Sequence, residues 1–166
     1  SPDTIEAWVR LGFLANGEAG GVIFGNTCSD NKNGTKLEVD SNRHICFTWN
    51  GGESYIVFDK YTLESDTWVH LAVVRDTLNN NFALYVNGSI VQKVNKNVGT
   101  DSISKYVYIV GGDWSGWRQP KNHFRGEVAQ VTAYNASLTS KEVYKDYMNS
   151  DEISYKTRDD LLFNGE

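Results

Sequence analysis

Apolar and polar residues alternate along most of the chain with a period of two. In residues 4–11 every second side chain is apolar, which is typical of a β-strand with one face on a core. The same pattern predicts strands at residues 4–11, 22–25, 36–40, 44–49, 54–58, 68–75, 82–86, 89–94, 106–110 and 127–134. Residues 68–75 are almost continuously apolar, which predicts a central strand covered on both faces. Asn50-Gly51-Gly52 and Asn87-Gly88 predict tight hairpin turns between strands.

One helix is predicted, and it lies late in the chain. Thr139 and Glu142 have the spacing of a capping box, in which each side chain bonds the backbone N–H of the other residue. An apolar stripe on this helix is predicted to dock on the sheets, and it consists of Val143, Tyr144, Tyr147 and Met148. Many short strands and one late helix predict an all-β fold, a two-sheet antiparallel β-sandwich with one short C-terminal helix. Alternating helices, which a βαβ fold would need, are not predicted.

Composition narrows the classes of protein and partner. The 166 residues are expected to form a single domain over residues 1–166. A net charge of −5 counts against nucleic acid and against an anionic membrane as the main partner. No apolar run approaches the ~20 residues of a membrane span, so membrane insertion is not expected. Fifteen glycines and 13% aromatic residues agree with many short strands joined by turns.

Six short strings carry a resemblance to a known family. In order they are Thr4-Ile-Glu-Ala-Trp-Val-Arg10, Thr67-Trp-Val-His-Leu-Ala-Val-Val-Arg-Asp76, Leu84-Tyr-Val-Asn-Gly88, Ile109-Val-Gly-Gly-Asp113, Phe124-Arg-Gly-Glu-Val128 and Ala133-Tyr-Asn-Ala-Ser-Leu138 with Glu142. Their order and spacing, over roughly residues 4–147, resemble the laminin G-like, concanavalin A-like jelly-roll family. The resemblance implies a jelly-roll fold. It also implies a carbohydrate-binding module, lectin or adhesion domain, extracellular or at the cell surface, within a larger secreted protein.

The N-terminal side departs from the family pattern. Family members usually carry one or two strands before the Thr-Ile-x-Ala-Trp motif, whereas this chain starts at the motif. Residues 160–163, Asp-Leu-Leu-Phe, are a candidate to take that sheet position. If the position were unfilled, the sheet would have an open edge that invites pairing with another chain.

The residues argue against catalysis. Laminarinase-type enzymes of this fold use a Glu-x-Asp-x-x-Glu motif, because retaining hydrolysis needs two carboxylates about 5 Å apart. The nearest string here runs from Glu38 through Asp40 to Arg43, so arginine stands where the acid/base would be. Glu38 and Asp40 are therefore expected on a solvent-facing strand. His70, inside an apolar strand, is expected to be a structural histidine.

The two cysteines leave two alternatives. Cys28 and Cys46 lack the spacing of a zinc site. They either form one disulfide that pins a loop to the sheet, or remain unpaired, with Cys46 a small core residue.

Two regions are predicted to bind a sugar, which needs an aromatic ring for stacking and a fan of polar groups. The residues of the first, a glycine-rich loop, are Asp113, Trp114, Trp117, Arg118, Lys121 and His123, with Gln119 and Asn122 as further polar groups. Those of the second, a hairpin tip, are Trp49, Glu53 and Tyr55. In both regions the alternative is that the tryptophans pack into the protein. Convergence of Arg118, Lys121 and His123 would favour an acidic sugar.

The predicted function is that of a non-catalytic carbohydrate-binding module, with a glycan or oligosaccharide as partner. The alternative is a protein-binding adhesion or assembly domain, since the same fold presents sheet edges to protein surfaces. The resemblance also implies one structural calcium. Oxygen-rich positions that could supply ligands are Asp30, Asn31, Asn33, Asp101 and Asp113, although no ligand set is assigned.

Overall fold

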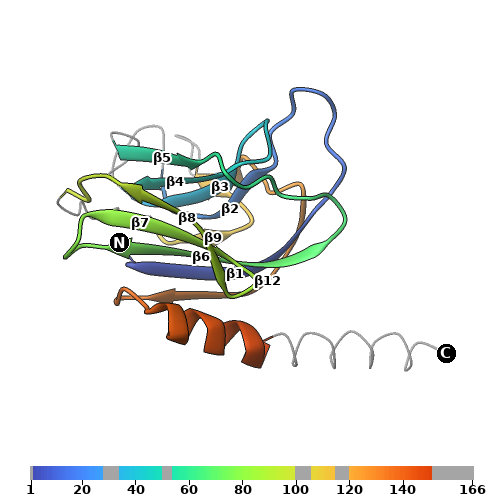
Figure 1. Ribbon diagram of the computed structural model, residues 1–166. Coiled ribbons are helices and arrows are strands. Elements are labelled where there is room, and N and C mark those ends of the chain that lie inside the picture. The colour runs from blue at the N-terminus through green and yellow to red at the C-terminus, as the bar shows by residue number, and fades with distance from the viewer. Residues whose placement is uncertain (1, 28–33, 50–53, 100–105, 115–119, 151–166) are drawn as a thin grey trace.

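A computed structural model describes residues 2–27, 34–49, 54–99, 106–114 and 120–150. Strands and one helix make up most of these residues (Figure 1). The strands are β1 (Thr4–Leu11), β2 (Gly21–Gly25), β3 (Lys36–Val39), β4 (Ile45–Trp49), β5 (Ser54–Phe58), β6 (Trp68–Asp76), β7 (Asn81–Val86), β8 (Ser89–Asn95), β9 (Ile109–Val110), β10 (Asp113–Trp114), β11 (Pro120–Lys121) and β12 (Gly126–Tyr134). The described part of the helix covers residues 140–150.

Two five-stranded antiparallel sheets form the sandwich. Sheet A has the order β12-β1-β6-β7-β8, and sheet B has the order β5-β4-β3-β2-β9. Strands β10 and β11 form a separate two-stranded ribbon, which the alternation pattern did not predict. Strand β6 lies between β1 and β7, so its predicted central place is confirmed. The predicted jelly-roll sandwich with one late helix is likewise confirmed.

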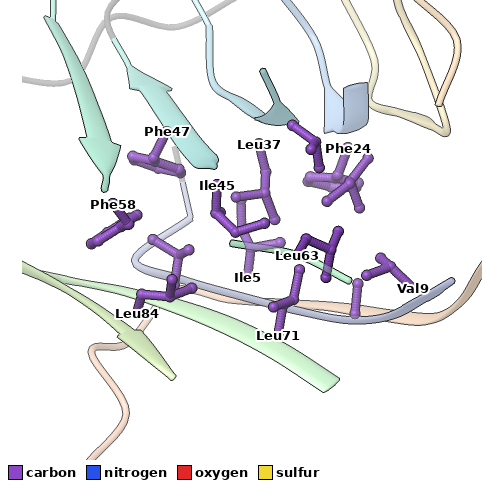
Figure 2. Packing of buried hydrophobic residues seen from close by; sticks show 14 of the residues in the cluster. Ile5, Val9, Phe24, Leu37, Ile45, Phe47, Phe58, Leu63, Leu71 and Leu84 are labelled. Carbon is purple, nitrogen blue, oxygen red and sulfur yellow. The ribbon is translucent and has the colours of Figure 1, made fainter. Parts of the chain in front are cut away.

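The core fills the space between the two sheets. Strand alternation turns one side chain in two inward, so Leu71 and Leu84 of sheet A face Ile45 and Phe47 of sheet B (Figure 2). These side chains are almost completely removed from solvent. At about 25 cal/mol per Å² of buried apolar surface, such contacts are the main stabilising contribution to the fold.

The C-terminal helix covers the outer face of sheet A (Figure 1). Its capping box is confirmed, because the Thr139 N–H donates to Glu142 Oε2 at 2.8 Å and the Glu142 N–H donates to Thr139 Oγ1 at 3.3 Å. The predicted docking stripe is only half right: Val143 is buried, but Tyr144 and Met148 are 51% and 49% exposed. The outer face of sheet A carries polar and aromatic side chains. Asp146 of the helix faces this surface and accepts a hydrogen bond from Tyr134 of β12.

The edge of sheet A bears on the expected missing strand, which stays a prediction. Strand β1 is paired on both sides, with β12 and with β6, so among the described strands β12 is the edge. Gln130 adopts a positive φ of 51° where the pairing register of β12 with β1 shifts. A bulge of this kind bends an edge strand and discourages pairing with another chain. The segment 160–163, proposed for the strand position, lies outside the described residues.

Candidate ligand-binding site

The outer face of sheet B carries polar side chains. Because Leu37 and Val39 point into the core, Lys36 and Glu38 of β3 point outward. The register then places Lys36 beside Thr48 of β4, and Thr48 beside Tyr55 of β5. This row of three residues gives the face a mixture of charge, hydroxyl and aromatic ring.

Local bonds hold the two acidic side chains of this face. Lys36 Nζ lies 3.0 Å from Glu38 Oε2. Asp40 Oδ1 accepts the backbone N–H groups of Asn42 and His44, each at 2.8 Å, and so closes the turn between β3 and β4. Glu38 and Asp40 are both partly exposed, which agrees with the expected solvent-facing strand.

Cys46 of β4 pairs with Glu38 of β3 and lies beside it on this face. It is a free, buried thiol, so the disulfide alternative is not realised in this structure. Burial raises the pKa of the Cys46 thiol to about 11. A thiol with this pKa is a poor nucleophile and a poor metal ligand at neutral pH, because both roles need the thiolate.

A pocket of about 480 Å³ opens at the end of this face. The lining residues come from three parts of the chain that are far apart in sequence. They are Ala19, Gly21, Glu38, Val39, Asp40, Ser41, Asn122 and Arg125. Carboxylate acceptors therefore share the pocket with amide and guanidinium donors. Arg125 Nη1 also lies 2.8 Å from Glu18 Oε1, which holds the guanidinium at the rim.

Residues 120–125 form an arm along β2, and backbone bonds fix the arm in place. The Val22 N–H donates to Asn122 O and the Arg125 N–H donates to Gly20 O, both at 2.8 Å. Gly21 has a φ of 89°, and a Cβ there would lie only 2.2 Å from the carbonyl oxygen of His123. Only glycine allows this approach. The Gly20-Gly21 pair is thus the sequence signal that could have indicated the pocket. Of the lining residues, Asn122 alone belongs to a predicted binding region, and sequence reasoning missed the others as ligand-binding residues.

The first predicted region is partly described. The ribbon pairs Asp113 with Lys121. Asp113 is buried, and its carboxylate accepts the Thr27 hydroxyl and, at 2.8 Å, the Trp114 N–H, so it holds the ribbon in place. Lys121 is partly buried, and His123 is exposed next to the pocket residue Asn122.

Trp114 is partly buried in a satellite cluster. Its indole N–H donates to Val107 O at 2.7 Å, and its ring stacks on that of Tyr106 with 5.6 Å between centroids. This contact covers one face of the ring. Trp117 and Arg118 lie outside the described residues, so the predicted convergence of three cationic side chains stays a prediction.

The second predicted region needs a correction at Trp49. The side chain is 1% exposed, its N–H donates to Val98 O at 2.7 Å, and its ring lies 4.3 Å from that of Phe82. No ring face remains for a sugar, so Trp49 is a core residue. Tyr55 is 40% exposed on β5 and keeps its candidate role. Glu53 lies outside the described residues.

The implied calcium finds little support in the described residues. Four of the five oxygen-rich candidates, Asp30, Asn31, Asn33 and Asp101, lie outside them. The fifth, Asp113, already accepts hydrogen bonds from two protein donors. No cluster of three or more His, Cys, Asp or Glu side chains suited to a metal occurs in the described parts of the chain. The calcium ion stays an implication of the family resemblance, and we assign it no ligands.

The two facing antiparallel sheets define a jelly-roll sandwich. The chain belongs to the laminin G-like family within the concanavalin A-like lectin/glucanase superfamily, whose sequence profile matches residues 1–144. None of the curated proteins compared with the chain matches it. Among the described residues, no helix is long and apolar enough to cross a membrane.

Solved structures with the same fold have low sequence identity to the chain. A heptameric SAP-like pentraxin from Limulus polyphemus has a TM-score of 0.63 and 19% identity, over 85% of this chain and 67% of that one. A putative carbohydrate binding protein from Bacteroides ovatus has 0.66 and 17%, over 85% of this chain but only 39% of that one. The CBM40 of a Ruminococcus gnavus IT-sialidase, bound to α2,3 sialyllactose, has 0.64 and 15%, over 87% and 81%. Identities this low show a shared fold alone.

Proposed function

We propose that the domain is a non-catalytic glycan-binding module of a larger secreted or surface protein. The observation that carries the proposal is the pocket in which Glu38 and Asp40 lie with Asn122 and Arg125. A sugar hydroxyl both donates and accepts hydrogen bonds, so neighbouring hydroxyls are matched by carboxylate acceptors and amide or guanidinium donors in one pocket.

The chemistry of the pocket favours a neutral, hydroxyl-rich sugar. Two carboxylates among its lining residues would repel the carboxylate of an acidic sugar. The Ruminococcus gnavus neighbour is bound to a sialoside, so an acidic sugar is the natural competitor in any test. For this chain, an acidic sugar would depend instead on Lys121 and His123 of the arm, together with Arg118.

The domain is proposed to hold its parent protein near a glycan, without changing the glycan. Arg43 follows Asp40 at the position where a retaining hydrolase would need its acid/base, and it adopts a φ of 63° in the turn. Single sites of this kind bind with affinities on the order of micromolar to millimolar. Neighbouring modules would add avidity.

A protein-binding role is the second candidate. Val107, just before the short edge strand β9, and Val110, within β9, are 71% and 56% exposed. Exposed apolar side chains at a sheet edge are suited to a protein surface.

A glycan array with neutral and acidic sugars tests the proposal, read with and without a calcium chelator. We expect binding to neutral oligosaccharides, unchanged by chelator. Arg125→Ala should weaken that binding by about tenfold, because a charge-assisted hydrogen bond contributes about 1.5–3 kcal/mol. Arg10→Ala removes an arginine that pairs with Asp66 outside the pocket and serves as the matched control.

Four results would count against this proposal. If the domain bound acidic sugars selectively and Arg125→Ala left this binding unchanged, the binding site would lie at Lys121 and His123 of the arm and not in the pocket. Loss of glycan binding in the presence of the chelator would show that binding requires a calcium ion. No sugar binding at all would favour the protein-binding role, and a shortened glycan, detected by mass spectrometry, would overturn the non-catalytic assignment.

A further inference from the structure

Several titratable side chains meet between sheet A and the C-terminal helix, on the side of sheet A that faces away from the core. Sheet A contributes Glu6 of β1, His70 of β6 and Tyr134 of β12, while the helix contributes Asp146 and Tyr147. Figure 1 shows the helix lying along this side of the sheet. Glu6 and His70 are each only 3% exposed. Ionisable groups with so little water around them need partners.

Two carboxyl groups face each other at this interface. The side chains of Glu6 and Asp146 are neighbours here, and Tyr134 Oη donates to Asp146 Oδ2 at 2.8 Å. Glu6 Oε1 has no hydrogen-bond partner among the described residues. Since an ionised carboxylate has only acceptors, two carboxyl groups bond each other only when one of them holds a proton.

The groups around the pair do not supply a compensating positive charge. Burial lowers the pKa of His70 to about 4, so its ring is neutral at pH 7, packed 5.4 Å from Trp8 and 5.6 Å from Tyr147. No ion pair within the described parts of the chain joins Glu6 or Asp146 to a lysine or arginine. Burial, with the bond and charge of Asp146, raises the pKa of Glu6 to about 8.

Two further hydrogen bonds join the helix to the outer face of sheet A. The Trp8 indole N–H donates to Ser150 Oγ at 2.9 Å, and Tyr85 Oη lies 2.9 Å from Ser140 Oγ. Val143 is the fully buried apolar residue of the described helix, while Tyr147 packs on Trp8 and Tyr144 borders Gly88 of the β7–β8 turn. The polar contacts add to this apolar surface, so their loss weakens the docking of the helix.

We propose that the C-terminal helix is a proton-dependent latch, which docks on sheet A with one proton held between Glu6 and Asp146 and is released when that proton is lost. Release leaves two carboxylates, which repel each other and regain water. It also uncovers Trp8 and His70. The latch is on sheet A and the pocket is on sheet B, so this inference does not depend on the proposed glycan binding.

Amide hydrogen exchange of the full chain tests the latch. Exchange of residues 140–150 is compared with that of β6 by mass spectrometry from pH 6.5 to 9, after correction for intrinsic rates. We expect the protection of the helix to fall by about tenfold per pH unit up to the pKa of Glu6, about 8, and to level off above it, because opening releases one proton. The helix should also exchange faster than β6 at every pH, as expected for local opening.

Substitutions of Glu6 and Asp146 test whether these two carboxyl groups hold the proton. Glu6→Gln can donate to Asp146 at any pH, so it should flatten the pH dependence of helix protection. Asp146→Asn, which removes the opposing charge, should reduce it and serves if Glu6→Gln does not fold. Glu127→Gln, which removes an exposed carboxyl of β12 that pairs with Arg10, is the control and should keep the wild-type slope. A flat wild-type profile, an unchanged slope in Glu6→Gln, or equal protection of the helix and β6 would each overturn the latch.

Discussion

Trp49 and Tyr55 lie on paired strands but on opposite faces of sheet B. Trp49 pairs with Ser54, whereas Tyr55 pairs with Thr48. Trp49 therefore joins Phe47 in the core, while Tyr55 points toward solvent. Two aromatic residues from one predicted binding region thus have different roles, because they point to opposite faces of the sheet.

Substitution to alanine should separate the two roles. Trp49→Ala leaves a large cavity and should lower the free energy of unfolding by about 3–5 kcal/mol. Tyr55→Ala should change it by less than about 1 kcal/mol, because the ring is substantially exposed. Urea denaturation measures both. Equal losses for the two variants would show that Tyr55 also supports the core.

The face of the sheet on which Trp49 and Tyr55 lie could be predicted from the sequence, because alternate residues of a strand point to opposite faces. Ile45, Phe47 and Trp49 alternate on one face, so the pattern that predicted the strand already placed Trp49 among core residues. The packing of Trp114 on Tyr106 could not be predicted in this way. It depends on a ribbon of two-residue strands, too short for any periodic pattern.

At the scale of elements, the hairpin between β7 and β8 supports the C-terminal helix. Asn87 and Gly88 have φ values of 48° and 79°, as the predicted tight turn requires. A Cβ on Gly88 would lie 2.8 Å from Tyr147 Cδ1 and 3.0 Å from Tyr144 Cδ2. The turn glycine therefore also lets the helix approach. The capping box located this helix from sequence, but its rotation depends on groups of sheet A that no local pattern reveals.

Gly88→Ala should loosen the helix for two reasons, the positive φ and the contact with Tyr147. Gly111→Ala is the matched control, since Gly111 has a φ of 75° and a Cβ added there would meet nothing within 4 Å. We expect Gly111→Ala to cost about 1 kcal/mol, the backbone strain alone. Gly88→Ala should cost more, as measured by urea denaturation. Equal costs would mean that the helix adapts freely to the extra methyl group.

At the scale of the whole molecule, the pocket joins the segments around Gly21 and Asp40 to the segment around Arg125, which follows about one hundred positions after Gly21. The strands could be predicted from local alternation because each is defined by its own residues. The pocket could not, because it exists only once β2, β3 and the arm have come together. The family motifs predicted the jelly roll, and the roll itself placed these segments side by side.

The pH dependence of global stability also belongs to this scale. His70 has a lower pKa in the folded chain, about 4 against 6.5, so its contribution is lost as pH falls below 6.5. Glu6 has a raised pKa, about 8 against 4.5, so its contribution is lost as pH rises above 4.5. Between pH 4.5 and 6.5 the two slopes oppose each other.

His70→Gln should therefore unmask the Glu6 slope. Relative to wild type, this variant should gain stability as pH falls from 6.5 to 4.5, by up to about 1.4 kcal/mol per pH unit. Urea denaturation of both proteins at several pH values measures the difference. A constant difference between them would show that His70 does not titrate on unfolding.

The pairing of β1 with β12 has a consequence for how the protein is made. The Thr4 hydroxyl bonds the carbonyl oxygen of Ala136, 132 positions later in the chain. During synthesis β1 can pair with β6 midway through the chain, but its second neighbour, β12, exists only after almost the whole described sequence has been made. Folds that depend on such distant pairings form slowly, over milliseconds to seconds. Until β12 arrives, one edge of β1 is open to other chains, and the emerging polypeptide passes through its most aggregation-prone stage.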